Sequence, residues 1–148
     1  MFDVRMSEID EHDAAELEQA VISFNIATTG HDDARSLGCV LRDDTGTLLG
    51  GLAGFTWGGY GMIDWLWVRE DLRHHGLGAR LVRAAEDSAR VRGCRIMRVN
   101  SHTFQAPPFY DGLGYTRIGS ADGTPVGHGE VFFAKRLDAR SPSGTDRT

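Results

Sequence analysis

The stretch of sequence that decides the fold is DWLWVREDLRHHGLGARLV, residues 64–82. An apolar run ends at Val68, a charged turn follows, and RHHGLG then opens a segment with helical periodicity. The first N–H groups of a helix lack intrahelical partners and carry partial positive charge, so they attract anions. Gly76 and Gly78 let an anion approach this backbone, and Arg73 can add a charge-assisted hydrogen bond. The junction therefore predicts a site for a phosphate or a pyrophosphate.

Two widespread phosphate-binding patterns do not fit this junction. A Walker loop requires GK[ST] after its last glycine, where this chain has GAR. The dinucleotide pattern requires a third glycine, which GLGARL lacks. Taken alone, a G-x-G at the start of a helix does not identify the ligand.

Composition restricts the class of protein. A chain of 148 residues with 41% hydrophobic and 25% charged residues is typical of one globular domain. The formal charge of −5 argues against a nucleic-acid-binding protein. No window reaches 18 uncharged apolar residues, and the first residues lack a secretory pattern, so we expect a cytoplasmic protein without membrane association. We expect Cys39 and Cys94 to be free thiols, and the spacing of the six histidines predicts no metal site.

Hydrophobic periodicity predicts a mixed α/β domain over residues 1–137, followed by a disordered tail at 138–148. The expected strands are residues 2–7, 37–43, 47–57, 62–68, 94–101, 115–120 and 130–137. The expected helices are residues 7–28, 78–93 and 106–114. The second to fourth strands should form an antiparallel meander, because short turn sequences separate them.

The junction resembles the acyl-CoA-binding signature of the GNAT N-acetyltransferase superfamily, Q/R-x-x-G-x-G/A after a strand that ends in L-x-V. FYDGLGY at 109–115 is similar to the Y-x-x-L-G-[FY] segment of that family, and VFFAKRL at 131–137 is similar to its closing strand. TFQAPPFY and VGH resemble segments of a bacterial subgroup. The resemblance implies a single domain with a mixed, mostly antiparallel sheet of about six to seven strands flanked by helices.

The resemblance also implies acetyl-CoA as the co-substrate. Its pyrophosphate would lie on the amides of residues 74–79, and its pantetheine arm would pair along residues 66–68. The family often has glycine where this chain has His74, and asparagine where it has Thr103, whose hydroxyl could replace a pantetheine contact. The implied cofactor-binding residues are Leu66, Trp67, Val68, Arg73, His74, His75, Gly76, Leu77, Gly78, Ala79 and Thr103.

Two residues are candidates for acid–base catalysis of acetyl transfer. Tyr110 stands where the family places the acid that protonates the CoA thiolate; the alternative is that its ring only packs on the cofactor. Asp64 lies in an apolar strand, where alternation predicts that it shares a partly desolvated face with Met62 and Leu66. It is either the base, acting directly or through water, or a structural carboxylate.

The acceptor side is less defined by the sequence. Phe24 and Asn25, at the expected end of the first helix, are candidate lid residues by resemblance. Trp57 beside the GGYG turn and His128 before the last strand are further candidates for substrate binding, with core packing as the alternative for Trp57. We expect Trp65 and Trp67 to pack against helices, and His12, His31 and His102 to be surface residues.

The leading hypothesis is an N-acetyltransferase that transfers acetyl from acetyl-CoA to a primary amine of a small molecule, by direct attack in a ternary complex. An acidic protein suits cationic acceptors. A protein N-terminal or lysine acetyltransferase and a non-catalytic acyl-CoA-binding module are the alternatives. The sequence predicts no nucleic-acid partner and no metal, and it leaves open whether the protein forms a homodimer.

Overall fold

The computed structural model describes residues 1–138, which form two units, residues 1–32 and residues 33–138. The first unit contains helix α1 (Glu11–Thr29). The Asp10 side chain caps its start by accepting a hydrogen bond from the Asp13 amide, and Gly30 ends it in the left-handed conformation. The apolar side chains of α1, among them Leu17 and Phe24, are exposed.

The second unit is built on one six-stranded sheet in the order β1-β2-β3-β4-β6-β5. The strands are β1 (Arg35–Arg42), β2 (Leu48–Trp57), β3 (Tyr60–Val68), β4 (Ile96–His102), β5 (Thr116–Asp122) and β6 (Gly129–Arg136). β3 and β4 pair in parallel, and the other neighbouring strands pair antiparallel. The predicted mixed, mostly antiparallel sheet and its meander are confirmed.

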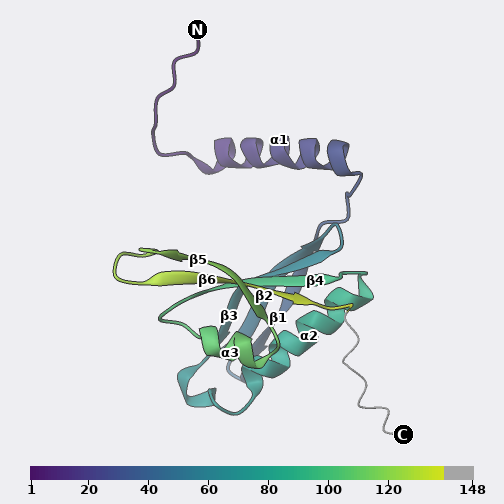
Figure 1. Ribbon diagram of the computed structural model, residues 1–148, viewed down its shortest axis with the longest axis vertical. Coiled ribbons are helices and arrows are strands. Elements are labelled where there is room, and N and C mark those ends of the chain that lie inside the picture. Colours follow the sequence, from purple (N-terminus) through teal and green to yellow (C-terminus); the bar gives the residue numbers. More distant parts are fainter. Residues whose placement is uncertain (139–148) are drawn as a thin grey trace, which may run out of the picture. The chain divides into compact units, whose positions relative to one another are not determined.

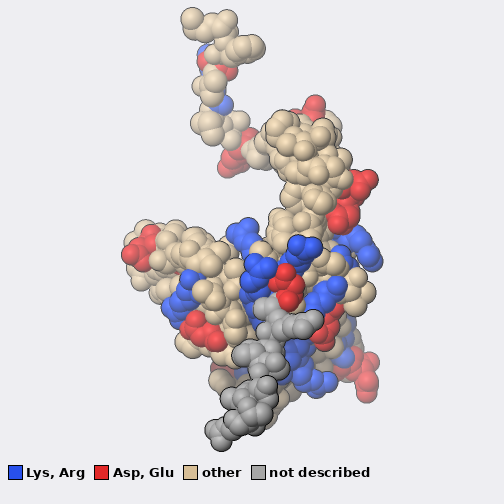
Figure 2. All heavy atoms as spheres, turned by 45° about the vertical axis from the view of Figure 1, so that its right-hand side comes forward, with Lys and Arg blue, Asp and Glu red and all other residues tan. Residues whose placement is uncertain are grey.

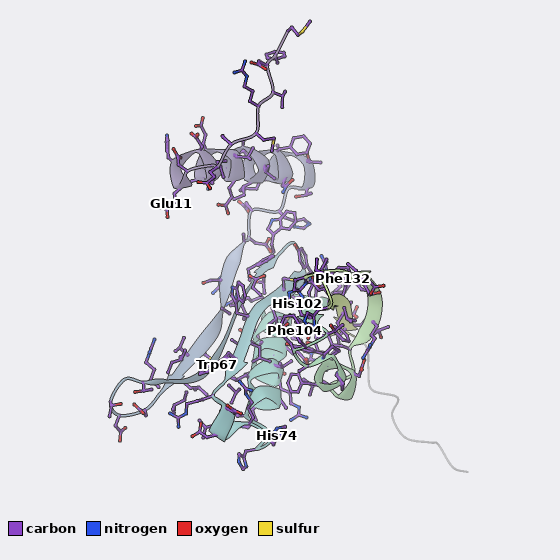
Figure 3. The ribbon with its side chains drawn as sticks, turned by 90° about the vertical axis from the view of Figure 1, so that its left-hand side faces the viewer. Glu11, Trp67, His74, His102, Phe104 and Phe132 are labelled. Atoms are coloured by element: carbon purple, nitrogen blue, oxygen red, sulfur yellow. The ribbon has the colours of Figure 1, made fainter. Side chains whose placement is uncertain are left out.

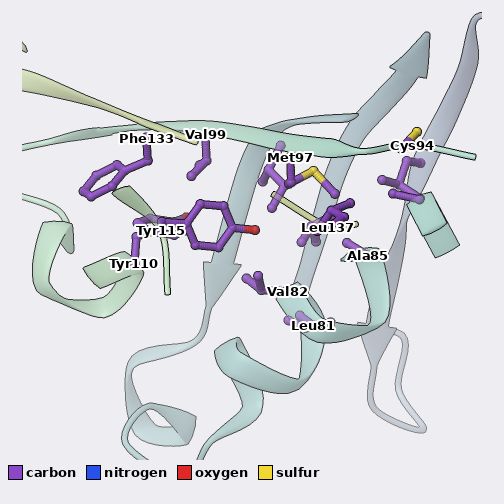
Figure 4. Packing of buried hydrophobic residues seen from close by; sticks show 14 of the residues in the cluster. Leu81, Val82, Ala85, Cys94, Met97, Val99, Tyr110, Tyr115, Phe133 and Leu137 are labelled. Atoms are coloured by element: carbon purple, nitrogen blue, oxygen red, sulfur yellow. The ribbon is translucent and has the colours of Figure 1, made fainter. Parts of the chain in front are cut away.

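Helices α2 (Leu77–Val91) and α3 (Pro107–Gly112) lie on the same side of the sheet (Figure 1). A short 3-10 helix, η1 (Glu70–Leu72), precedes α2. Apolar side chains of the sheet, such as Met97, Val99 and Phe133, point toward Leu81 and Val82 of α2 (Figure 4). Burying this apolar surface holds both helices against the sheet.

A β-bulge divides β3 into two halves. Ala53 of β2 faces Trp65 and Gly54 faces Ile63, so Asp64 has no partner on β2. Glycine is required at 54, because a Cβ there would collide with the Met62 carbonyl oxygen. The bulge shifts the alternation, so Ile63 and Val68 are both buried although regular alternation would place them on opposite faces.

The parallel ladder between β3 and β4 ends at the same point. It runs from Tyr60 and Ile96 to Ile63 and Val99, and no pairing follows within the described residues. Beyond it, β3 continues to pair with β2, and β4 continues to pair with β6. The two strands therefore separate, and a gap opens in the middle of the sheet.

A buried ion pair joins α2 to the far half of the sheet. Glu86 is only 2% exposed and accepts hydrogen bonds from Lys135 Nζ at 2.8 Å and from the Tyr115 hydroxyl at 2.9 Å. Lys135, the only lysine in the sequence, also donates to the Leu113 carbonyl at the end of α3. Glutamate is almost never fully buried unless it is paired, and the two partners Lys135 and Tyr115 allow its burial here.

Several sequence-based expectations differ from the structure. The strand predicted at 2–7 is absent, since residues 1–10 have no regular structure. Within residues 33–138 neither Trp65 nor Trp67 packs against a helix, and they are 76% and 44% exposed. The bulge explains this error in part, because it changes which face each side chain of β3 occupies. The predicted tail lies outside the described residues except for Asp138.

Other expectations concern thiols and membrane spans. Cys39 and Cys94 are free, as expected, and burial raises the pKa of the Cys94 thiol. Within residues 1–138, none of the helices has the length and hydropathy needed to span a bilayer. Basic and acidic side chains are intermixed on the face shown in Figure 2, which is typical of an ordinary hydrated surface.

The buried ion pair gives a testable prediction. Glu86→Leu should lower the free energy of unfolding by about 3 kcal/mol, because it leaves the Lys135 ammonium and the Tyr115 hydroxyl without their acceptor. Asp87→Leu is the matched control on the same helix, where the exposed pair with Arg90 should contribute less than about 1 kcal/mol. Urea denaturation measures both.

The double variant Glu86→Leu/Lys135→Met should recover part of the loss, since it removes both charges together. Losses that simply add in the double variant would contradict an interaction between the two side chains.

Candidate active site

The separation of β3 and β4 forms a pocket of about 380 Å³. It is lined by residues 62–66 of β3, residues 99–102 of β4, Gln105, Ala106, Phe109, Tyr110, and Glu130 of β6. The buried Val99 and Ser101 alternate along β4 with Asn100 and His102, so the lining includes side chains from both faces of the sheet. The pocket therefore connects the face covered by α2 and α3 with the opposite face.

Tyr110 of α3 faces this pocket from the helix side. It is 6% exposed, and its ring contacts Phe109, Tyr115 and Phe133 with centroid separations of 5.0–5.7 Å. Burial raises the pKa of Tyr110 to about 12. The phenol therefore stays protonated at neutral pH, and no hydrogen bond within residues 1–138 occupies its hydroxyl. This is the state that a hydrogen-bond donor to a reacting atom requires.

Asp64 lies at the bulge and lines the same pocket. Its side chain is exposed, which corrects the prediction of a partly desolvated carboxylate sharing a face with both Met62 and Leu66. Leu66 packs toward the core with Val68, while the bulge places Met62 on the other face. Within residues 1–138 the Asp64 carboxylate makes no hydrogen bond or ion pair, so no turn amide or arginine gives it a structural role.

Residues 64–68 of β3 leave one backbone edge unpaired beside the gap. On their other side, Leu66, Trp67 and Val68 pair with Leu52, Gly51 and Gly50. The Val68 carbonyl accepts a hydrogen bond of 2.8 Å from Arg73 Nε, which holds the following loop against the strand. An extended ligand could pair along this free edge as a further strand does.

The loop after β3 brings residues 74–79 to the start of α2. Gly76 is the N-cap and adopts φ +79°, and open space surrounds the position that its Cβ would occupy. Gly78 lies beside α3, since a Cβ there would be in ordinary van der Waals contact with the Phe109 ring, at 3.4 Å. The amides of residues 77–79 form the free start of the helix.

His74 also has a left-handed backbone, with φ +64°, and is the one non-glycine residue of this kind within residues 1–138. Its side chain is exposed and points away from the sheet (Figure 3). This conformation gives a physical reason for the glycine that the family often has here. His75, its neighbour, is exposed and does not share the left-handed conformation.

Several further candidate residues lie outside the pocket lining. Thr103 Oγ1 accepts a hydrogen bond from the Gly129 amide at 3.0 Å, so the hydroxyl holds the first residue of β6. Trp57 packs edge-on against Tyr60, which favours the packing alternative. Phe24 and Asn25 belong to the unit of residues 1–32. They lie within α1 and not at its end, which is at Thr29. Their role as a lid stays a prediction.

His128 also lies outside the pocket lining, and it belongs to an aromatic cluster at the rim of the pocket. His128 contacts the ring of Phe104 edge-on at 5.0 Å, and Phe104 stacks on His102 at 5.2 Å (Figure 3). His102 is partly buried and lines the pocket, which corrects its assignment as a surface residue. Its Nδ1 donates to the Thr124 carbonyl at 2.9 Å. The cluster borders the pocket on the face opposite α2.

Sequence reasoning missed Asn100 and Glu130, which line the pocket from β4 and β6. Both are polar residues that alternate with buried residues in a strand. Alternation alone would have marked them as ordinary exposed positions. Their proximity follows from the pairing of β4 with β6, which joins parts of the chain about thirty residues apart.

Comparisons with known proteins agree with this architecture. The family model described as the acetyltransferase (GNAT) family matches residues 3–115. An acetyltransferase of Agrobacterium fabrum is 32% identical over 127 residues, which are 83% of this chain and 93% of that protein. The blasticidin-S acetyltransferase of Streptomyces morookaense is 38% identical over 95 residues, which are 64% of this chain and 70% of that protein.

Solved structures show the same fold. The crystal structure of an acetyltransferase from Bacillus cereus has a TM-score of 0.77 and 30% identity, with 90% of this chain and 97% of that chain covered. Structures that share the fold at 17% identity include complexes with acetyl-CoA and with CoA.

The backbone at position 74 gives a prediction on stability. His74→Gly should be more stable than His74→Ala by about 1 kcal/mol, because a Cβ is disfavoured at positive φ. The order should reverse at position 75, where glycine only adds freedom to the unfolded chain. Thermal unfolding of the four variants measures the two differences. Alanine more stable than glycine at both positions would contradict the left-handed conformation of residue 74.

Proposed function

Because the chain belongs to the GNAT acetyltransferase family, we propose that it transfers the acetyl group of acetyl-CoA to a primary amine of a small molecule. The observation that carries this proposal is the pocket at the separation of β3 and β4. It joins a protonated, buried phenol on the helix side to a carboxylate at the bulge. Acetyl transfer needs an acid and a base at one reacting centre.

The donor substrate would be held by backbone groups. The free edge of residues 64–68 suits the amides of the pantetheine arm, and the start of α2 suits the pyrophosphate. Arg73, whose Nε is already bonded to the Val68 carbonyl, has terminal nitrogens that can reach a phosphate. These contacts would direct the thioester toward the pocket beside Tyr110.

The chemical step is a direct attack in a ternary complex. The amine nitrogen forms a C–N bond with the thioester carbonyl carbon as the C–S bond breaks. The ammonium proton passes to Asp64, directly or through water, and the Tyr110 hydroxyl donates its proton to the leaving sulfur. The exposure of Asp64 favours this role, because a carboxylate at the rim can exchange the proton with solvent afterwards.

A small acceptor fits the size of the pocket and the relatives. A pocket of about 380 Å³ is at the small end of the range for small-molecule sites. One relative, 38% identical over 95 residues, is named for acetylating a small molecule, blasticidin S. A protein N-terminal or lysine acetyltransferase remains the second candidate. The family and the named relatives favour an active enzyme over a non-catalytic module.

A thiol-release assay with acetyl-CoA and a panel of amines tests the donor site. Gly76→Asp should raise the KM for acetyl-CoA at least about tenfold, because a carboxylate would stand where the pyrophosphate binds. Gly76→Asn is the matched control, since it imposes the same strain without the charge. Equal KM values for the two variants would place the pyrophosphate elsewhere.

The pH dependence of turnover separates the two catalytic roles. Asp64→Asn should remove the acidic limb of the kcat/KM profile, because the ionisable base is lost. Tyr110→Phe should lower kcat by about 10²-fold, the lower range for general acid catalysis, at all pH values up to about 10. The loss should not vary with pH there, since the pKa of Tyr110 is about 12 and the phenol stays protonated throughout this range.

An unchanged acidic limb in Asp64→Asn would show that Asp64 is not the catalytic base. An unchanged kcat for Tyr110→Phe, with chemistry shown to limit the rate, would leave Tyr110 as a packing residue.

A further inference from the structure

One buried polar atom in the pocket has no partner. Asn100 Oδ1 is enclosed and forms no hydrogen bond with the described residues. Enclosed polar atoms in folded proteins nearly always have a hydrogen-bond partner, because leaving one unmatched is costly. Since Asn100 lines the pocket, a ligand that enters there can supply the missing donor.

The position of Asn100 relates it to the acceptor side. Along β4, the residues buried under the helices are Met97, Val99 and Ser101. Asn100 and His102 alternate with these residues and therefore face the opposite side of the sheet. Tyr110, by contrast, enters the pocket from the helix side. The unmatched oxygen thus lies on the side of the pocket away from the proposed acid.

A residue with a carboxylate, Glu130, is the diagonal neighbour of Asn100 on the same face of the sheet. Glu130 of β6 pairs with His102. Asn100 pairs with Phe132, which lies two residues after Glu130 in β6. Glu130 is partly buried, lines the pocket, and makes no hydrogen bond or ion pair with its side chain within residues 1–138. Diagonal neighbours on one face of an antiparallel pair are close enough for both side chains to reach one ligand.

The charges that line the pocket are of one sign. The lining includes the carboxylates Asp64 and Glu130 and contains no lysine or arginine. The one imidazole, His102, uses Nδ1 to donate to the Thr124 carbonyl outside the pocket. Hydrogen-bond acceptors and negative charge therefore dominate the face opposite α2, and an ammonium group satisfies both.

We propose that Asn100 Oδ1 and Glu130 bind a second protonated amine of the acceptor, so that the preferred substrates are compounds with at least two amino groups. One amine enters the gap between β3 and β4 toward Tyr110 and reacts. The other donates hydrogen bonds to Asn100 Oδ1 and neutralises Glu130 on the face opposite α2. This inference rests on the proposed function and specifies its substrate class.

Matched pairs of amines test the proposal. Linear diamines of three to five carbons and monoamines of the same length, with a methyl group in place of the second amine, are compared by thiol release from acetyl-CoA. The wild-type protein should show kcat/KM at least about tenfold higher for the best diamine than for its monoamine. Asn100→Leu and Glu130→Gln should each reduce this preference by about tenfold, where the preference is the ratio of the diamine to the monoamine kcat/KM in the same variant.

Two further variants serve as controls. Asn100→Asp keeps the acceptor oxygen and should retain the diamine preference, which separates hydrogen bonding from folding defects in Asn100→Leu. Asp122→Asn removes one exposed carboxylate of β5 outside the pocket lining and should leave the preference unchanged. Melting temperatures of all variants confirm that they fold.

Each other outcome overturns the proposal in a distinct way. Turnover of monoamines without any diamine preference refutes the second amine site but leaves the proposed function standing. A raised KM for acetyl-CoA in Asn100→Leu would assign the unmatched oxygen to the pantetheine arm. If no amine on the panel is acetylated while acetyl-CoA still binds, the proposed function itself fails.

Discussion

The architecture of the candidate site depends on one constraint, which is that β3 does not pair with both of its neighbours beyond Ile63. The bulge at Asp64 turns the strand, and the parallel ladder with β4 ends at Ile63 and Val99. A continuous sheet would have no gap, and Tyr110 on one side could not share a pocket with Asn100 and Glu130 on the other. The glycine at 54 permits the bulge, because a side chain there would collide with the Met62 carbonyl. The backbone geometry of β3 therefore determines which side chains can share the pocket.

The gap between β3 and β4 leaves the two halves of the sheet with few backbone hydrogen bonds between them. Side-chain interactions connect the two halves instead. Helix α2 packs under the β1–β3 half and extends the Glu86 carboxylate to Lys135 of β6 and Tyr115 beside β5. Lys135 in turn holds the Leu113 carbonyl at the end of α3, the helix that carries Tyr110. The Glu86–Lys135 pair thus connects α2 to the end of α3, the helix that carries Tyr110.

Much of this fold could be predicted from the sequence, because its elements have clear periods and turns. The meander, α2 and the glycine-rich junction follow from local patterns, and the family resemblance added their order in space. Residues 2–7 alternate like a strand but have no pairing partner within the described residues, which alternation cannot reveal. The bulge at Asp64 was hidden because it depends on the register with β2. Asn100 and Glu130 were missed for the same reason, since strand pairing and the gap bring them together.

Amide hydrogen exchange with and without acetyl-CoA tests the central claim, that the donor lies along the free edge of β3 and ends at the start of α2. We expect slower exchange in the presence of acetyl-CoA at residues 77–79 and at those amides of residues 64–68 that do not pair with β2. Amides within the β1–β2 ladder should exchange at the same rate in both conditions. Protection confined to β5 and β6, with residues 64–68 and 77–79 unaffected, would contradict it.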